Sequence, residues 1–331
     1  AMILLGSALM SKGQNIRAMS YMKQALQTRD APEFRTVLGL SMMRSGQAAN
    51  AIPELEAALK QNPGQMQAAT ALVVLYQRTG QTPKAVALAE KITKQHPANA
   101  EFFNLLGVAK RQAGKPADAK AAFEQAVKLD GKLASPRLNL ARMEIAEKAY
   151  DAAATRLAGV LKADDKNAEA MFEMALLSER RNQLPEAQRW LEKTVDSANP
   201  REVRWPLALA EFHLRHGRPG PALEAAKTAS SRAPEDLAVL MTLARMQLAN
   251  KDAASARSTL TTATRVAEYN APMQVQIALL ELAANHAAGA AYSLEKALSG
   301  QPDFLPAQAL MTETELRMGE PAKAEKRARS I

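Results

Sequence analysis

Residues 105–130 read LLGVAKRQAGKPADAKAAFEQAVKLD, and this stretch predicts a helical hairpin. Ala119, Phe123 and Ala126 are spaced by four and then three residues, which places them on one face of a helix. A Leu-Leu-Gly segment stands before the Gly-Lys-Pro turn, and its small residue lets a second helix approach closely. We therefore expect two helices that pack against each other across a tight turn.

The same pattern returns along the chain at a nearly constant interval. The turn recurs as Gly or Asn followed by a polar residue, at Gly13, Gly46, Gly80, Gly114, Asn182, Gly217 and Gly319. The successive intervals are 33, 34, 34, 68, 35 and 102 residues, close to multiples of 34. The spaced alanines keep the same register, for example as Ala290, Leu294 and Ala297. A fixed period in this range predicts a solenoid of repeated units.

The unit resembles the tetratricopeptide repeat (TPR) in its period, in Leu-Gly or Leu-Ala in the first helix (A) and in Ala-x3-Phe/Leu-x2-Ala in the second (B). Terminal prolines such as Pro63 and Pro97 match as well. The resemblance implies an all-α, right-handed α-solenoid (superhelix) of about ten stacked helix-turn-helix repeats. We expect one TPR array over residues 1–331, as a fragment of a longer chain. Its repeats are expected at 1–31, 32–65, 66–99, 100–133, 134–167, 168–202, 203–236, 237–270, 271–304 and 305–331 (partial).

Two segments depart from this pattern. Pro206 lies inside the expected start of a first helix, so this helix should begin late or bend there. The segment Asn285 to Gly289 (NHAAG) replaces the usual turn of its repeat.

Composition excludes several classes of function. The 331 residues contain no cysteine, which rules out disulfides, thiolate metal sites and cysteine nucleophiles. No stretch is apolar for long enough to predict a transmembrane segment. His213 and His216 are three residues apart, which could suit a metal, but no second ligand motif accompanies them and a solvated helix end is the preferred interpretation. We therefore expect no enzyme activity, no cofactor and no metal.

The TPR resemblance implies a binding groove lined by the A helices, about two, five, nine, twelve and thirteen residues into each repeat. A groove of this kind suits an extended peptide or a helix. Apolar side chains are frequent at these positions and favour a partner surface, although some of them could pack against the next A helix instead. The candidate groove residues are Thr70, Asn104, Val108, Arg111, Leu138, Arg142, Ile145, Phe172, Leu176, Leu207, Glu211, Met241 and Arg245.

Arginines recur late in the A helices and admit two explanations. They are Arg44, Arg78, Arg111, Arg180, Arg215 and Arg317, with Arg142 and Arg245 one turn earlier. Together with the net charge of +9, they could bind an anionic polymer, either polysaccharide or nucleic acid. The alternative is that cations near helix C-termini stabilise the helix dipole. No specific nucleic-acid motif is present.

We expect a non-enzymatic scaffold that binds a protein or peptide partner in the groove. The segments 138–146 (LNLARMEIA) and 243–246 (LARM) resemble bacterial TPR lipoproteins associated with PEP-CTERM and exopolysaccharide export. That resemblance implies a role in the bacterial cell envelope and favours the periplasm over the cytoplasm, although the compartment is otherwise unknown. Binding of an anionic polymer along the arginines is the alternative, and self-association through apolar end faces is another.

Overall fold

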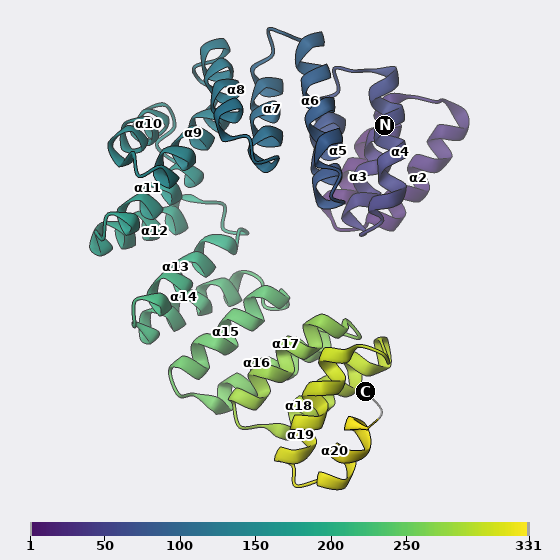
Figure 1. Cartoon of the computed structure of the whole chain (residues 1–331), viewed down its shortest axis with the longest axis vertical. Helices are drawn as coiled ribbons and strands as arrows, with labels where there is room; N and C mark the ends of the chain where they lie inside the picture. The colour runs from purple at the N-terminus through teal and green to yellow at the C-terminus, as the bar shows by residue number, and fades with distance from the viewer. Residues whose placement is uncertain (1, 330–331) are drawn as a thin grey trace. The chain divides into compact units, whose positions relative to one another are not determined.

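The computed structural model describes residues 2–329 as helices that alternate between A and B types (Figure 1). The A helices are α1 (Met2–Ser11), α3 (Pro32–Arg44), α5 (Met66–Arg78), α7 (Ala100–Gln112), α9 (Ala134–Ala146), α11 (Ala168–Arg180), α13 (Arg204–Arg215), α15 (Leu237–Ala249), α17 (Ala271–Ala283) and α19 (Leu305–Arg317). The B helices are α2 (Asn15–Thr28), α4 (Ala48–Gln61), α6 (Thr82–Gln95), α8 (Pro116–Leu129), α10 (Tyr150–Ala163), α12 (Leu184–Ser197), α14 (Pro219–Arg232), α16 (Ala253–Ala267), α18 (Ala287–Gly300) and α20 (Pro321–Ala328). No strand occurs within residues 2–329, so the predicted all-α repeat fold is confirmed.

Each A helix ends in the same turn. In the repeat of the opening stretch, Gly114 has a φ of +71° and the Lys115 amide donates to the Lys110 carbonyl at 3.0 Å. This hydrogen bond closes a Schellman motif and satisfies a carbonyl that the helix end leaves open. The left-handed residues of the A-to-B turns are Gly13, Gly46, Gly80, Gly114, Lys148, Asn182, Gly217, Lys251, Asn285 and Gly319.

The NHAAG segment keeps this turn instead of replacing it. Asn285 has a φ of +53°, and the His286 amide donates to the Glu281 carbonyl at 2.9 Å, as in the other repeats. An asparagine adopts the left-handed conformation at lower cost than most residues with a Cβ atom. Helix α13 begins at Arg204, one residue after the expected repeat boundary, and its Pro206 lies in the first turn, where a missing amide donor costs little.

The two helices of each repeat meet through paired small and large residues. Gly107 packs against Phe123 so closely that a Cβ atom at Gly107 would lie 2.5 Å from the Phe123 ring. Gly39 is related in the same way to Leu55, with a corresponding distance of 2.7 Å. The pair Val73 and Ala89 reverses the sizes, and both side chains are fully buried or nearly so. In the repeats of Gly39 and Gly107, the small residue that the sequence predicts for a close crossing thus has a matching large residue on the B helix.

The helices form two compact units that divide between Asp165 and Lys166. In the N-terminal unit α1, α3, α5, α7 and α9 pack in succession, and in the C-terminal unit α13, α15, α17 and α19 do the same. We call these successive A helices the A-helix row of each unit. These helices and α11 carry every position that the sequence proposes for ligand binding.

Candidate functional site

The A helices carry the candidate groove residues, most of them at or near the surface. Thr70 and Arg245 are exposed, and most of the others are half-buried. Leu138 differs because it is only 6% exposed, so it contributes packing and offers no surface to a partner. Their distribution is Thr70 on α5; Asn104, Val108 and Arg111 on α7; Leu138, Arg142 and Ile145 on α9; Phe172 and Leu176 on α11; Leu207 and Glu211 on α13; Met241 and Arg245 on α15.

In the N-terminal unit, hydrogen bonds join neighbouring A helices across the row. The Asn139 side-chain amide on α9 donates to Asn104 Oδ1 on α7 at 2.9 Å. Arg142 Nη1 donates to Asn139 Oδ1 at 3.4 Å on the same helix. Asn139 is buried, so this bond fixes the Asn104 side chain at the edge of the row. This part of the row is polar and already hydrogen-bonded to itself.

Aromatic and cationic groups join α11 to α13 at the start of the C-terminal unit. The rings of Phe172 and Trp205 have centroids 5.3 Å apart. The Arg204 guanidinium lies 3.8 Å from the centre of the Trp205 ring and forms an ion pair with Glu169 at 2.5 Å. Half-buried Phe172 therefore belongs to a packed contact between repeats and presents only part of its ring to solvent.

Carboxylates hold several of the arginines that the sequence offered for anion binding. Arg245 Nη1 lies 2.7 Å from Glu211 Oε1 on the preceding A helix, and Arg317 Nη2 lies 2.6 Å from Glu313 Oε1. In the N-terminal unit, Arg44 Nη1 donates to the Met10 carbonyl near the end of α1 at 3.0 Å. These contacts compensate arginine charge within the chain, and the Arg44 contact fits the helix-end explanation.

Glu179 contacts Arg215 at the end of the next A helix and His216 directly after it. Its Oε1 lies 3.0 Å from Arg215 Nη2 and 2.9 Å from His216 Nε2. Burial raises the pKa of Glu179, but the hydrogen bonds from His216 and Arg215 outweigh it, so the pKa lies below its ordinary value. The carboxylate is therefore ionised at neutral pH and neutralises Arg215.

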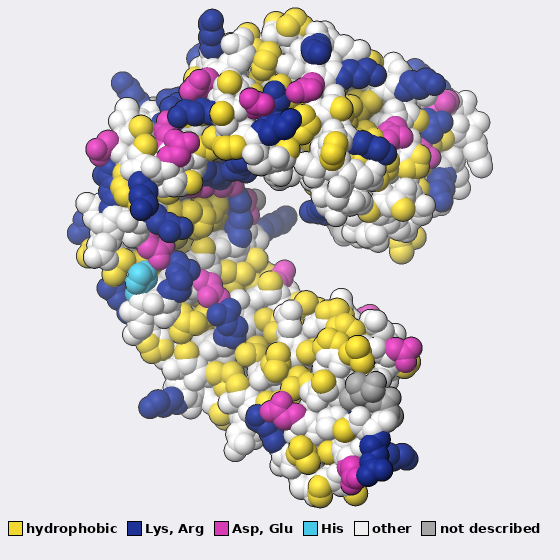
Figure 2. Space-filling model, in the orientation of Figure 1, with side chains coloured by type: hydrophobic (Ala, Val, Ile, Leu, Met, Phe, Trp, Pro, Cys, Tyr) yellow, Lys and Arg dark blue, Asp and Glu magenta, His cyan; other side chains and the backbone are white. Residues whose placement is uncertain are grey.

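Later in the C-terminal unit the A-helix row becomes apolar. Half-buried Leu207 and Met241 are followed at the same register by half-buried Val275 on α17. Leu279 on α17 is 52% exposed, and Leu316 on α19 is 56% exposed. Figure 2 shows hydrophobic side chains gathered over α15 to α18 in this unit. Leu279 is not among the groove residues predicted from the sequence, although its place nine residues into its repeat could have identified it.

A second set of residues was not predicted from the sequence. At one fixed position of the A helices these residues are mostly polar, whereas the TPR pattern has an apolar or aromatic residue there. This polar row occupies the eleventh position of successive repeats, where the TPR pattern has Tyr. Its members are Tyr76, Lys110, Glu144, Ser178, His213, Gln247, Glu281 and Glu315, all of them buried except Lys110. The recurrence of charged residues at the eleventh position of the repeats could have identified this row in the sequence.

Side chains of the B helices satisfy several members of the polar row. Arg156 Nη2 lies 2.5 Å from Glu144 Oε1, and Arg327 Nη2 lies 2.8 Å from Glu315 Oε1, at the same offset within each repeat. The Thr259 hydroxyl lies 2.9 Å from Gln247 Oε1. In these three repeats the polar row couples the A helix to its own B helix. Tyr76 and Lys110 instead contact Glu56 and Glu90 on the B helix of the preceding repeat.

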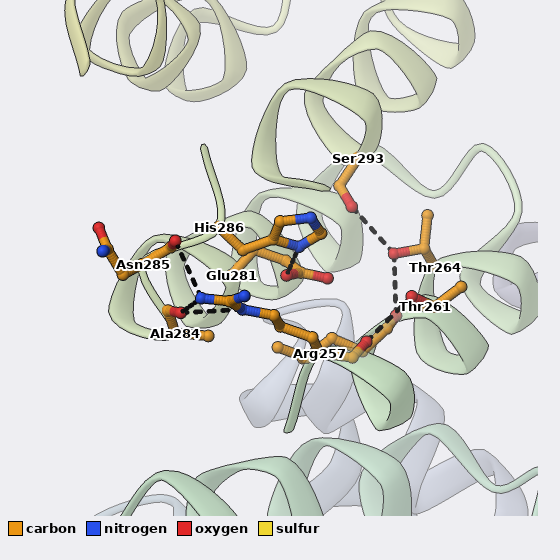
Figure 3. Close-up of polar contacts among 9 residues, drawn as sticks. Arg257, Thr261, Thr264, Glu281, Ala284, Asn285, His286 and Ser293 are labelled. Carbon is orange, nitrogen blue, oxygen red and sulfur yellow. Dashed lines mark hydrogen bonds and ion pairs between the residues drawn. The ribbon is translucent and has the colours of Figure 1, made fainter. Parts of the chain in front are cut away.

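Glu281 is the most deeply buried carboxylate of the polar row (Figure 3). Its Oε2 lies 2.7 Å from His286 Nδ1, and it is 2% exposed. Burial raises the pKa of Glu281, and the contact with His286 lowers it only in part. Arg257 of the preceding repeat donates to the Ala284 carbonyl at 2.7 Å, which ties α16 to the turn after α17.

The two spaced histidines do not form a metal site. His213 is 4% exposed, and burial lowers its pKa, so the expected solvated helix end is wrong for this residue. His216 faces Glu179 instead. Among residues 2–329, no group of three or more His, Asp or Glu side chains is arranged to hold a metal ion. None of the helices in the described part is long and apolar enough to cross a membrane.

Comparisons with known proteins agree on the repeat type. Family models described as tetratricopeptide repeat match residues 1–31, 42–108, 104–155 and 207–271, which together cover more than half of the chain. No curated protein matches the sequence. A crystal structure of a tetratricopeptide repeat protein from Parabacteroides merdae is similar, with 18% identity and a TM-score of 0.56, over 74% of this chain and 97% of that chain. At this identity the likeness concerns the fold alone.

Two further structures are similar at lower scores. Pseudomonas aeruginosa PilF matches with 19% identity and a TM-score of 0.46, over 66% of this chain and 99% of that chain. A chain of the APC/C hetero-tetramer Cut9–Hcn1 matches with 13% identity and a TM-score of 0.49 over 90% of this chain. The matched region spans 58% of that longer chain.

Proposed function

Because the chain belongs to the tetratricopeptide repeat family, we propose that it is a non-enzymatic scaffold that binds a protein partner along the A-helix row of its C-terminal unit. The observation that carries this proposal is the apolar surface formed by Met241, Val275, Leu279 and Leu316. Apolar side chains that collect on one exposed face are typical of a partner surface. The partner supplies a helix or an extended segment with apolar side chains at regular spacing.

The ion pairs favour this partner over an anionic polymer. Arg215, Arg245 and Arg317 each contact a carboxylate within the unit, which lowers the positive charge available to a polyanion. Polyanion binding depends steeply on salt, whereas burial of leucine and methionine does not. We therefore expect partner binding to persist when salt is raised.

The test compares two double variants of the full chain in affinity capture from lysate of the source organism. Met241→Glu with Leu279→Glu places two charges on the A-helix row. Leu129→Glu with Tyr292→Glu places two charges on exposed positions of B helices, where Leu129 is 37% and Tyr292 is 56% exposed. We expect the first variant to lose at least tenfold in recovery of the captured protein and the second to match the wild type. Equal loss in both variants, or capture that salt abolishes, would contradict the proposal.

The finer part of the proposal is a role in bacterial cell-envelope or exopolysaccharide assembly. Its support is the resemblance of residues 138–146 and 243–246 to envelope TPR lipoproteins. Separate capture from soluble and envelope fractions tests this part. Recovery of the partner from the soluble cytoplasmic fraction alone would overturn the envelope role and leave the scaffold function intact.

A further inference from the structure

A pocket lies between the B helices α4 and α6 of two neighbouring repeats in the N-terminal unit, with α5 at its floor, and none of its lining residues is a candidate groove residue. It has a volume of about 580 Å³, which is within the range of about 300–1,000 Å³ that ligand pockets occupy. Leu59 of α4, Leu72 and Tyr76 of α5 and Ile92 of α6 line it with buried apolar surface, and half-buried Leu88 adds to the wall. We call this the outer pocket.

Lysines surround the opening of the outer pocket. Lys60 at the end of α4 and Lys91 of α6 line it and are exposed. Exposed Lys84 of α6 places its ammonium 5.7 Å from the centre of the Tyr76 ring. The one carboxylate that lines the pocket, Glu56, accepts a hydrogen bond from the Tyr76 hydroxyl. The rim is therefore positive around an apolar floor.

Tyr76 holds Glu56 in place at the rim. Burial and the hydrogen bond to Glu56 both raise the pKa of Tyr76, so its hydroxyl remains a donor throughout the physiological range. Glu56 thus has an internal partner, whereas no ion pair joins a carboxylate to Lys60, Lys84 or Lys91 among the described residues. An incoming acidic group would meet unpaired lysines.

We propose that the outer pocket binds a bulky apolar side chain of a partner protein whose neighbouring residues are acidic. The apolar side chain would lie on Leu59, Leu72 and Ile92, and carboxylates beside it would pair with Lys60 and Lys91. This site shares no residue with the candidate groove positions or with the apolar side chains Met241, Val275, Leu279 and Leu316, and it would give the scaffold a second, charge-selective contact. A nucleic acid offers no bulky aliphatic or benzyl group for the floor, and a neutral apolar segment leaves the lysines unused.

The test uses end-blocked peptides and the full chain labelled at Leu and Ile methyl groups for NMR. The probe is Asp-Glu-Phe-Glu-Asp, and its two controls are Asp-Glu-Ser-Glu-Asp and Lys-Lys-Phe-Lys-Lys. We expect the probe alone to shift the methyl signals of Leu59, Leu72, Leu88 and Ile92. Lys60→Glu with Lys91→Glu should weaken binding at least tenfold. Lys128→Glu with Lys162→Glu makes the same charge change on exposed residues of α8 and α10 and should change affinity less than twofold.

Three outcomes would overturn the proposal. The probe could shift other methyl signals but none in the outer pocket, or the serine control peptide could bind as tightly as the probe. The two double variants could also weaken binding of the probe equally. The methyl spectra report whether each variant is folded. Since the variants on Met241 and Leu279 test the A-helix row, the two sites can fail independently of each other.

Discussion

Every described A-to-B turn places one residue in the left-handed region, and most repeats use glycine there. Lys148 and Lys251 occupy the same position with φ values of +63° and +62°. The left-handed conformation costs a residue with a Cβ atom about 1–2 kcal/mol, whereas glycine adopts it freely. The repeat geometry therefore imposes local strain at these two lysines.

We expect Lys251→Gly to raise the free energy of unfolding by about 0.5–1 kcal/mol. The gain is smaller than the strain because glycine also has more conformational freedom in the unfolded chain. Urea unfolding monitored by circular dichroism measures the change. Lys251→Ala is the control, since it removes the charge and keeps the Cβ atom. An equal gain from the alanine variant would show that charge, and not backbone strain, is responsible.

Glu281 makes stability depend on pH. Its folded-state pKa is raised, so its protonation favours the folded state, and this contribution is lost as the pH rises through the folded-state pKa. We expect Glu281→Gln to become more stable relative to the wild type as the pH rises from 4.5 to 8. The Gln oxygen can still accept the His286 hydrogen bond, so the comparison isolates the buried charge.

Urea-unfolding free energies across this pH range measure the effect. Glu313→Gln is the control because Glu313 is an exposed residue of α19, and its stability relative to the wild type should not rise with pH in this way. A difference between Glu281→Gln and wild type that stays constant with pH would contradict the assignment of the trend to Glu281.

Where the A and B helices of a repeat cross, the sizes of the two residues that meet are matched to each other. Gly107 pairs with Phe123, whereas the next repeat has Ala141 and Leu157 at the same two positions, both fully buried. Between these two repeats, a larger residue on the A helix accompanies a smaller one on the B helix. The two positions act as one unit of packing, and a change at one should be repaired by a change at the other.

We expect Gly107→Ala to destabilise the chain by about 1–3 kcal/mol because its Cβ atom would overlap the Phe123 ring. Adding Phe123→Leu should restore most of this loss, since the double variant reproduces the Ala141 and Leu157 pair. A double-mutant cycle of unfolding free energies measures the coupling. Additive losses would show that the two positions pack independently of each other.

The sequence predicts these helix pairs well because size and spacing are visible in it. Gly107, Phe123 and the left-handed glycines all occur at fixed register. The ion pair between Arg245 and Glu211 was not predicted, because it joins residues of different repeats and depends on side-chain directions. The left-handed Lys148 and Lys251 were also missed, since lysine carries no signal for a positive φ. The groove positions and the single array remain predictions.

Each of the two units is built from contacts between neighbouring helices. In the N-terminal unit, for example, α7 packs against α6 and α8 in sequence and against α5 and α9 along the row. Such an array gains stability repeat by repeat, and a local defect should open only the repeats near it. The outer pocket lies in the N-terminal unit, and the apolar side chains Met241, Val275, Leu279 and Leu316 lie in the C-terminal unit, so each site can be altered without loss of the other.

We expect Phe123→Ala, which removes a fully buried ring, to cost about 3–5 kcal/mol locally. Hydrogen exchange read by mass spectrometry should show faster exchange in α7 to α10 and unchanged exchange in α15 to α18. Leu260→Ala in α16 is the reciprocal variant and should affect the second group of helices alone. If either variant accelerates exchange equally in both groups, the chain unfolds as one cooperative body, and the repeat-by-repeat account of its stability is wrong.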